Sequence, residues 1–391
     1  MNFDPDPGAE AFRVEVDAFF AEHVTGAVIE RAHTTGTLHD WGLHRALAER
    51  GWLAAGWPVE YGGQARSVQE LAVLDDAVAR TGAPVDGWGT SDLVAQTLAI
   101  VGSEEQKRSI IPLVLSGEVV ICLGYSERDS GSDVAAAKTE AVRDGDEWRI
   151  NGSKMFTTLA QEASYVFLLT RTNRDVPKHR GLTMFVVPMD AVGVEIRAIE
   201  TLGGERTNVT FYNDVRVADT ARVGAVDAGW DVMKVALAFE RRPTAHGSAV
   251  RLLAQVEQWV RSAIDGSGRP LIEDPSVRER LARVAVDNAV GEMLKERMSW
   301  VTQCGGLPVV EGSMAKLWTS EALQRASGEF LDALGPEGVL QHGEDGAPVE
   351  GWVEQAWRHA TATTIYAGTS EIQRSIIAER RLGLPRGRPP G

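Results

Sequence analysis

The stretch TIYAGTSEIQR, residues 364–374, predicts a bend followed by the start of a helix. Ala367 and Gly368 form the bend, and Thr369 or Ser370 is suited to cap the helix N-terminus. The apolar residues that follow recur at helical spacing, at Ile372, Ile376 and Ile377. A helix N-terminus beside a glycine exposes backbone N–H groups that suit a phosphate, a carbonyl or an oxyanion. This loop is therefore a candidate binding site.

Length and composition indicate a globular protein of two or three domains. The chain has 391 residues, of which 43% are hydrophobic and 24% are charged. Its net charge of −15 argues against a nucleic-acid binder or an anionic-membrane binder. No apolar run reaches the roughly 20 residues that a membrane-spanning helix needs. Cys122 and Cys304 provide neither a disulfide framework nor a metal cluster, and together with the acidic N-terminus they favour the reducing cytoplasm.

The spacing of apolar residues divides the chain into three predicted domains. Residues 1–117 show helical spacing, residues 118–225 contain short strands separated by turns, and residues 226–391 are helical again. The middle region is predicted to be a small antiparallel barrel or sandwich, and the last region a four-helix bundle. The expected fold class is thus a multidomain α+β protein with helical, β and helical domains in this order.

Individual elements follow from the same spacing. Strands are expected at residues 119–123, 141–143, 147–150, 165–170, 182–187, 194–199 and 209–217. Helices are expected at 276–304 and 312–334, and a continuous apolar stripe predicts one long helix across residues 232–253. Ser103 and Gln106 have the spacing of a capping box that opens a further helix.

Two loops of the middle region carry hydroxyl groups and glycines. CLGYSERDSGSD, residues 122–133, follows a strand, and its backbone N–H groups could hold a pyrophosphate or the carbonyl edge of a ring. By itself this stretch is more typical of an ordinary polar turn. INGSKMFTT, residues 150–158, adds an aromatic side chain that could stack on a flat cofactor and hydroxyls that could bond a ring nitrogen. The two loops together predict a cofactor site.

Five motifs in this order resemble the acyl-CoA dehydrogenase family over about residues 10–385. They lie at residues 51–63, 126–133, 151–158, 202–207 and 366–374, with the sequences GWLAAGWPVEYGG, SERDSGSD, NGSKMFTT, LGGERT and YAGTSEIQR. The resemblance implies an α-domain, a β-domain and an α-bundle, with FAD between the β-domain and the bundle. It also implies removal of an α-proton by a carboxylate and hydride transfer from the β-carbon to flavin N5.

The resemblance assigns cofactor contacts to particular positions. The pyrimidine edge of the flavin is expected to meet the backbone at Leu123, Tyr125 and Ser126. Phe156 is expected to flank the isoalloxazine in place of the family's more usual Trp, and Thr158 to donate to N5. Near the pyrophosphate, the CoA arm and the rest of FAD, contacts are expected at Gly131, Ser132, Thr369, Ser370 and Glu371.

The catalytic carboxylate is expected at Glu240. The α-proton of a thioester is weakly acidic, so its removal needs a desolvated carboxylate of raised pKa and donors on the thioester carbonyl. In many family members this base follows the Tyr of the loop, where the chain has Ala367. A minority carries it before an Arg on the first long helix of the C-terminal bundle, which matches Glu240 and Arg241. Ala367 and Gly368 would keep backbone donors for the substrate, with Ser132 and Arg241 nearby. The alternative for Glu240 is a solvated helix carboxylate.

Other parts of the sequence depart from the family pattern. Segments 264–271 and 332–338 lack the Arg, Phe, Gln and Gly residues that usually hold FAD across a subunit boundary, and Arg128 replaces a usual Pro. These departures leave room for a heterotetramer with a related subunit beside a homodimer or homotetramer.

No metal site is predicted from the histidines. His39 and His44 lack further ligands and are interpreted as surface histidines. His246 is interpreted as a histidine packed within a helix rather than as a substrate contact.

The leading functional hypothesis is an FAD-dependent acyl-CoA dehydrogenase that forms a 2,3-enoyl thioester. Its electrons would pass to an electron-transfer flavoprotein, and an acyl-carrier-protein thioester stays open as substrate. One alternative is a flavin monooxygenase or oxidase on the same fold, for which an α-proton base is dispensable. Another is a non-catalytic partner subunit of a heteromeric acyl-CoA dehydrogenase.

Overall fold

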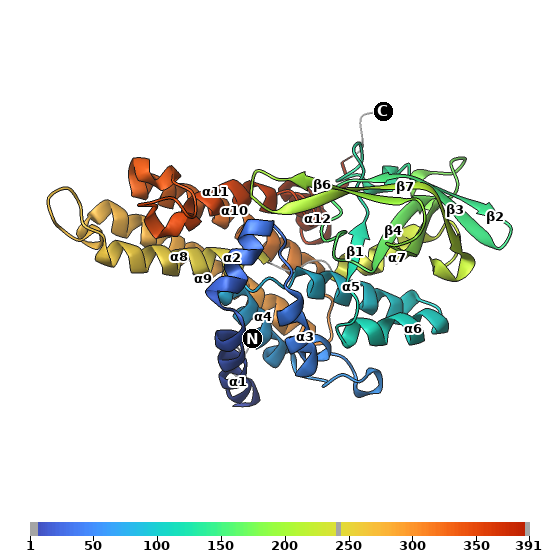
Figure 1. The fold of residues 1–391 in the computed structure, drawn as a ribbon, viewed down its shortest axis with the longest axis horizontal. Helices are drawn as coiled ribbons and strands as arrows, with labels where there is room; N and C mark the ends of the chain where they lie inside the picture. The colour runs from blue at the N-terminus through green and yellow to red at the C-terminus, as the bar shows by residue number, and fades with distance from the viewer. Residues whose placement is uncertain (1–6, 240–243, 388–391) are drawn as a thin grey trace.

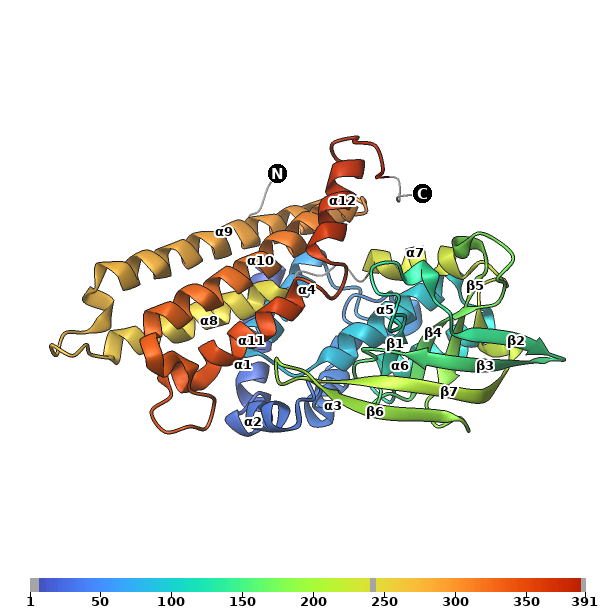
Figure 2. The same ribbon diagram turned by 90° about the horizontal axis from the view of Figure 1, so that it is seen from above.

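The computed structural model describes residues 7–239 and 244–387. Helices α1–α6 form an N-terminal domain, strands β1–β8 form a middle domain, and helices α8–α12 form an elongated bundle that extends away from the sheet (Figure 1, Figure 2). This arrangement confirms the predicted fold class, a multidomain α+β protein with helical, β and helical domains.

The N-terminal domain is built around an aromatic core. Its helices are α1 (Pro7–His23), α2 (Gly26–Thr35), α3 (Trp41–Glu49), α4 (Val68–Thr81), α5 (Asp86–Val101) and α6 (Glu104–Leu115). The buried Trp52 ring meets Phe12 and Phe19 edge-on, at centroid distances of 5.4 and 4.8 Å. The capping box predicted for α6 is confirmed. The Ser103 hydroxyl accepts from the Gln106 N–H at 3.2 Å, and the Gln106 side-chain oxygen accepts from the Ser103 N–H at 3.0 Å.

The middle domain is a mixed sheet in which antiparallel pairs predominate. Its strands are β1 (Ile121–Gly124), β2 (Glu140–Asp144), β3 (Glu147–Lys154), β4 (Tyr165–Arg171), β5 (Leu182–Pro188), β6 (Val194–Glu200), β7 (Arg206–Ala218) and β8 (Arg222–Val223). Their order is β6-β7-β3-β2-β4-β5-β8, with β1 beside β4. β1 and β4 run parallel because β2 and β3 lie between them in the chain and supply the crossover that a parallel pair requires.

The C-terminal domain continues from α7 (Gly229–Phe239) into long bundle helices. These are α8 (Thr244–Ser262), α9 (Pro275–Gln303), α10 (Val309–Leu334), α11 (Trp352–Thr363) and α12 (Ser370–Arg380). The bundle core is formed by α8–α11 and contains Leu252, Val256, Leu281, Leu323 and Phe330. The helices expected at 276–304 and 312–334 correspond to α9 and α10.

The helix expected across residues 232–253 corresponds to α7 and α8. Its middle part, residues 240–243, lies outside the described part of the chain. The two helices bury their apolar faces in different cores. Val232 of α7 packs in the core shared by the middle domain and α5, whereas Ala249 of α8 packs in the bundle. Spacing alone cannot show that tertiary packing divides one stripe between two cores.

Short 3-10 helices connect the longer elements. η1 (Trp52–Ala54) and η2 (Val59–Tyr61) build the Gly- and Pro-rich stretch 51–63, where the buried Trp57 donates to Asp92 Oδ1 at 2.8 Å. The others are η3 (Val134–Ala136), η4 (Lys178–Arg180), η5 (Asp219–Ala221), η6 (Leu271–Glu273), η7 (Gly335–Val339) and η8 (Pro348–Gly351).

The interpretation of His39 and His44 as surface histidines is wrong. Their exposed fractions are 7% and 1%, and their ring centroids lie 4.8 Å apart. Burial lowers the pKa of His39 to about 4 and that of His44 to about 3. α5 covers His39, since a Cβ added at Gly87 would come within 2.7 Å of the His39 ring. The sequence around His39 does not contain this contact.

Two features are absent from residues 7–239 and 244–387. No helix there is both long enough and apolar enough to cross a membrane. No group of three or more His, Cys, Asp and Glu side chains in the same ranges is placed to hold a metal ion.

Candidate cofactor and active site

The loop between α11 and α12 forms the bend that the sequence predicts. Ala367 and Gly368 have positive φ angles of 52° and 84°, and Thr369 is the N-cap of α12. The Thr369 hydroxyl accepts from the Ile372 N–H at 3.3 Å. Within the described ranges, the N–H groups of Ala367, Gly368 and Thr369 have no acceptor, so they are available to a ligand.

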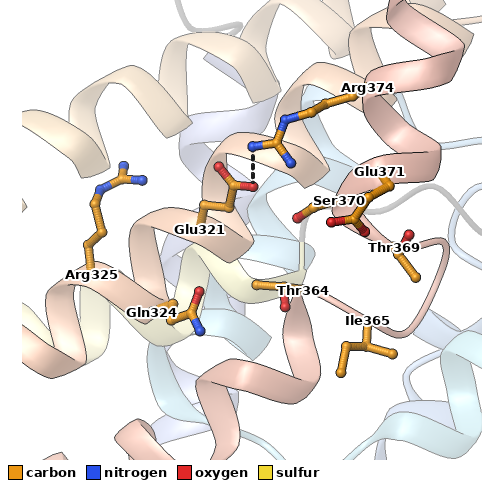
Figure 3. A pocket seen from close by; sticks show the side chains of 9 residues that line it. All are labelled: Glu321, Gln324, Arg325, Thr364, Ile365, Thr369, Ser370, Glu371 and Arg374. Carbon is orange, nitrogen blue, oxygen red and sulfur yellow. Dashed lines mark hydrogen bonds and ion pairs between the residues drawn. The ribbon is translucent and has the colours of Figure 1, made fainter.

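The start of α12 borders a hollow of about 380 Å³ (Figure 3). Its lining residues are Glu321, Gln324, Arg325, Thr364, Ile365, Thr369, Ser370, Glu371 and Arg374. The hollow therefore contains three predicted cofactor residues, at positions 369–371. The Ser370 hydroxyl is buried and has no partner in the part of the chain that the structure describes. An unpaired buried hydroxyl at a helix N-terminus fits a polar ligand such as the phosphate chain of FAD.

The charged side chains of the hollow mostly pair with neighbours. Arg374 donates to Glu321 at 2.7 Å (Figure 3), and Arg325 donates to Asp287 at 2.9 Å. The backbone N–H of Glu371 and then the Thr369 hydroxyl lower the pKa of the Glu371 carboxyl below its usual value. Glu371 is therefore ionised at neutral pH and suits the hydroxyl groups of a ligand better than its phosphates.

The second part of the site follows β1. Leu123, at the end of this strand, and Ser126 are half-buried, and Tyr125 is 9% exposed. The Ser126 carbonyl accepts from the Met155 N–H at 2.9 Å, which joins the loop after β1 to the end of β3. The loop after β1 and the end of β3 are therefore neighbours, although the β2–β3 hairpin separates them in the sequence. A shared cofactor site requires this proximity.

Gly131 and Ser132 lie on the open side of the same loop. Both are exposed, and a Cβ added at Gly131 would meet no atom within 4 Å. The buried Arg171 anchors the chain that follows, because it donates to the carbonyls of Ala135 and Ala137 at 2.6 and 3.2 Å. The residues predicted to contact the pyrophosphate and CoA are thus accessible, and the segment that follows them is held in place by Arg171.

A buried ion pair holds the β1 loop to β3. Lys154 Nζ donates to Glu127 Oε1 at 2.8 Å and to the Tyr125 carbonyl at 3.2 Å. Glu127 also accepts from the N–H groups of Lys138 and Thr139 at 2.7 and 2.8 Å. Burial raises the pKa of the Glu127 carboxyl, but the charge of Lys154 and these donors outweigh burial and hold it below its usual value. The Glu127 carboxylate therefore joins the start of the loop after β1 to its end at residues 138–139, and also to β3.

Phe156 and Thr158 follow β3 in an arrangement suited to a flat ring. Phe156 has a φ angle of 60°, and its side chain is 59% exposed although it is a large aromatic residue. The Thr158 hydroxyl lies 3.0 Å from the Thr207 hydroxyl of β7, which orients it. An exposed aromatic side chain on a strained backbone, beside an oriented hydroxyl, fits stacking against FAD.

The predicted base Glu240 and its neighbour Arg241 lie outside the described residues. α7, which precedes them, ends at Phe239, and Phe239 packs against the apolar cluster that contains Tyr125. The end of α7 and the loop after β1 therefore contribute to the same apolar cluster.

His246 has the role expected of a packed helix residue. It is 4% exposed, and its Nε2 lies 2.8 Å from Glu292 Oε2 on α9. This contact lowers the pKa of the Glu292 carboxyl to about 2.

Reasoning from the sequence missed the side chains that hold these loops in place. Glu127 and Lys154 belong to two of the quoted motifs but were given no role, and Lys316 and Gln373 hold the bend at 367–368. For Lys154 the available signal was that it is the single charged residue of NGSKMFTT.

Three family descriptions match the chain in order. They are "Acyl-CoA dehydrogenase, N-terminal domain" at residues 6–118, "middle domain" at 122–215 and "C-terminal domain" at 227–382. Together with the helical, β and helical domains and the loops described above, these matches define the class of protein. The chain belongs to the acyl-CoA dehydrogenase family, whose members are FAD-dependent oxidoreductases.

Individual relatives are similar over their whole length. Acyl-CoA dehydrogenase FadE26 of Mycobacterium tuberculosis is 36% identical over 405 residues, covering 99% of each chain. The crystal structure of the ChsE4-ChsE5 complex from Mycobacterium tuberculosis has a TM-score of 0.89 at 35% identity, covering 99% of this chain and 100% of the other. The Tcur3481-Tcur3483 steroid ACAD has a TM-score of 0.90 at 33% identity, with the same coverage.

Proposed function

We propose that this chain dehydrogenates the α,β-bond of an acyl-CoA thioester to give a 2,3-enoyl-CoA, with Glu240 as base and an electron-transfer flavoprotein as acceptor. The observation that carries the proposal is the packing of α7. Its last residue, Phe239, lies against the apolar cluster that contains Tyr125 of the β1 loop. Glu240 is the next residue in the sequence and itself lies outside the described residues.

Each polar group of the site would have its own role in the reaction. FAD, when bound, accepts the hydride from the β-carbon. Glu240 takes the α-proton, and the N–H groups of Ala367 and Gly368 donate to the thioester carbonyl, where negative charge develops. Thr158, oriented by Thr207, donates to the edge of the flavin ring.

The CoA part of the substrate would follow the open side of the site. Ser132 is exposed on the β1 loop, and Arg241 follows the proposed base in the sequence. Both are proposed contacts of the CoA arm, Ser132 as a hydroxyl donor and Arg241 as a cation for an anionic group.

The relatives support a bulky acyl group and a second, related subunit. One similar structure is described as a steroid ACAD, and both similar structures are described as pairs of chains. Segment 264–271, which departs from the family pattern, connects α8 to α9 at the end of the bundle far from the sheet (Figure 1). A contact from this segment to FAD would therefore be made with the cofactor of a neighbouring subunit.

The proposal predicts that Glu240→Gln separates catalysis from cofactor binding. Purified protein is mixed anaerobically with a panel of acyl-CoA and acyl-carrier-protein thioesters, and flavin absorbance is followed. Wild type should bleach, and Glu240→Gln should bleach about 10²- to 10⁴-fold more slowly while keeping its FAD, because a general base contributes that much. Glu257→Gln on α8, an exposed carboxylate paired with Arg261, is the control. Full-rate bleaching of Glu240→Gln would exclude it as the base.

The same experiment separates the alternatives. A flavin monooxygenase would keep its oxidised spectrum with every thioester. A non-catalytic subunit would purify without flavin and would acquire activity only through co-expression with a related chain.

A further inference from the structure

Two buried side chains from different helices hold the bend at Ala367 and Gly368. Lys316 of α10 donates from Nζ to the Gly368 carbonyl at 2.8 Å. Gln373 of α12 donates from Nε2 to the carbonyls of Ala367 and Gly368, at 3.0 and 3.2 Å. Lys316 is 4% exposed and Gln373 is 2% exposed, so both are packed between the helices and the loop.

These contacts determine the direction of the N–H groups of the loop. In a planar trans peptide, the N–H points opposite to the C=O of the preceding residue. The carbonyls of Ala367 and Gly368 point at the two buried donors, so the N–H groups of Gly368 and Thr369 point away from them. Neither N–H has an acceptor among residues 7–239 and 244–387. Thr369 lines the hollow of Figure 3 and Gly368 does not, so Thr369 is the residue that brings a free N–H to its wall.

The bend is strained and needs such support. Ala367 has a φ of 52°, and the left-handed region is unfavourable for a residue with a Cβ. A buried amine is also unfavourable unless it is hydrogen-bonded. The buried Lys316 amine gains its hydrogen bond from the bend, and the bend is held in its strained conformation by that bond. We interpret this pairing as a specific constraint on the loop rather than as general packing.

The wall of the hollow carries a further group that points to a ligand. The Ser370 hydroxyl is 6% exposed, lines the hollow and has no partner in the described part of the chain. The Lys316 charge also acts on the start of α12, where it contributes to lowering the pKa of Glu371 after the local N–H and hydroxyl donors. A cation behind the loop adds to the positive end of the helix.

We propose that Lys316 and Gln373 are positioning residues for FAD. They fix the Ala367–Gly368 bend so that the N–H group of Thr369 and the Ser370 hydroxyl meet the phosphate oxygens of the cofactor. This inference rests on FAD as the cofactor of the proposed function, but it does not depend on Glu240 or on the acyl group.

The test is the affinity of the apoprotein for FAD, measured by quenching of flavin fluorescence. Lys316→Met and Gln373→Met keep side-chain length and remove the donors. Each should raise the dissociation constant of FAD by at least about tenfold, which corresponds to about 1.4 kcal/mol. Lys107→Met on α6, whose ammonium pairs with Glu104 at 2.9 Å, is the matched control and should leave affinity unchanged. Circular dichroism of each apoprotein confirms folding, and if Lys316→Met does not fold, Gln373→Met decides.

Two outcomes would overturn the inference. One is a lowered melting temperature of the apoprotein with unchanged FAD affinity and spectrum, which is the result of a purely structural role. The other is equal loss of affinity in the Lys107→Met control. If wild type binds FAD but no thioester reduces it, the proposed function fails while the role of Lys316 and Gln373 stands or falls on the affinities alone.

Discussion

Lys154 is an ammonium group removed from water, with a side chain that is 0% exposed. Moving such a charge out of water costs several kcal/mol, and its bonds to Glu127 and to the Tyr125 carbonyl offset this cost. Burial lowers the pKa of Lys154 to about 8, although Glu127 raises it, so the pair is charged at neutral pH. At the residue scale, this pair is the joint between the loop after β1 and the end of β3.

Removing one partner of this pair should therefore be strongly destabilising. Lys154→Met leaves the Glu127 carboxylate with little solvent and no cation, and we expect a loss of about 3–5 kcal/mol in the free energy of unfolding by urea. Lys138→Met removes an ammonium that is 71% exposed and paired with Asp129, and should change stability by less than about 1 kcal/mol. Similar losses in the two variants would contradict the buried joint.

The two buried histidines predict a dependence of stability on pH. The folded-state pKa values, about 4 for His39 and about 3 for His44, lie below the usual 6.5, so the unfolded chain binds protons first as pH falls. Stability should be fully present above pH 6.5 and should decrease between about pH 6.5 and 4. Each histidine adds at most about 1.4 kcal/mol per pH unit to the slope.

Urea unfolding at several pH values in this window measures that slope. His44→Leu should reduce the slope of unfolding free energy against pH by the amount that one bound proton contributes. His179→Gln, at an exposed histidine, should leave the slope unchanged. An unchanged slope in His44→Leu would show that other groups take up the protons.

At the scale of elements, α6 shows how a local signal gains a tertiary role. Gln106 completes the capping box with Ser103, and its Nε2 also donates to the carbonyls of Thr220 and Arg222, at 2.8 and 3.0 Å. One side chain thus starts the helix and ties it to the segment that contains β8. The box is readable from the sequence, but the two long-range bonds are not.

Substitutions in this capping box should differ in cost accordingly. Ser103→Ala removes one cap and should cost about 1 kcal/mol in thermal or urea unfolding. Gln106→Ala also leaves two carbonyls without their donor and should cost roughly 2–3 kcal/mol. Ser109→Ala, whose hydroxyl bonds only within the same helix, controls for the loss of a hydroxyl. Equal costs for Ser103→Ala and Gln106→Ala would contradict the tertiary role.

At the scale of the whole molecule, all three domains meet at the connection between β6 and β7. Figure 2 shows this hairpin reaching from the sheet to α11. Arg358 of α11 donates to the Leu202 carbonyl at 2.6 Å, and His359 pairs with Glu205 at 2.5 Å. The Arg206 N–H donates to the carbonyl of Gly36, after α2, at 2.7 Å. The LGGERT motif is therefore a structural junction in addition to any cofactor role.

Arg358→Met should loosen this junction. Its guanidinium is also held by Glu354 at 2.6 and 2.8 Å, so it presents a fixed donor to the hairpin. We expect faster amide hydrogen exchange at residues 200–206, with exchange in β3 and β4 unchanged. Arg283→Met, on an exposed face of α9, should leave the hairpin unaffected. Unchanged exchange at 200–206 in Arg358→Met would contradict the junction.

The order of the domains and most helices and strands could be predicted from the amino-acid sequence, because apolar spacing and capping signals are local. The sequence also predicted the bend at Ala367 and Gly368 with Thr369 as cap, since a glycine and an N-cap hydroxyl act on their own backbone. The family followed from motifs that carry such local geometry. The roles of Glu240 and Arg241, which lie outside the described residues, stay predictions.

Which polar side chains are buried, and which segments they hold, depends on how the chain packs in three dimensions. The tertiary structure divided the stripe at 232–253 between two cores, buried His39 beneath α5 with His44 beside it, and brought Lys316 to the carbonyl of Gly368. The physical reason is the same in each case. Burial and the pairing of a charge depend on atoms supplied by distant segments, and the spacing of residues along one helix contains no record of what will cover it.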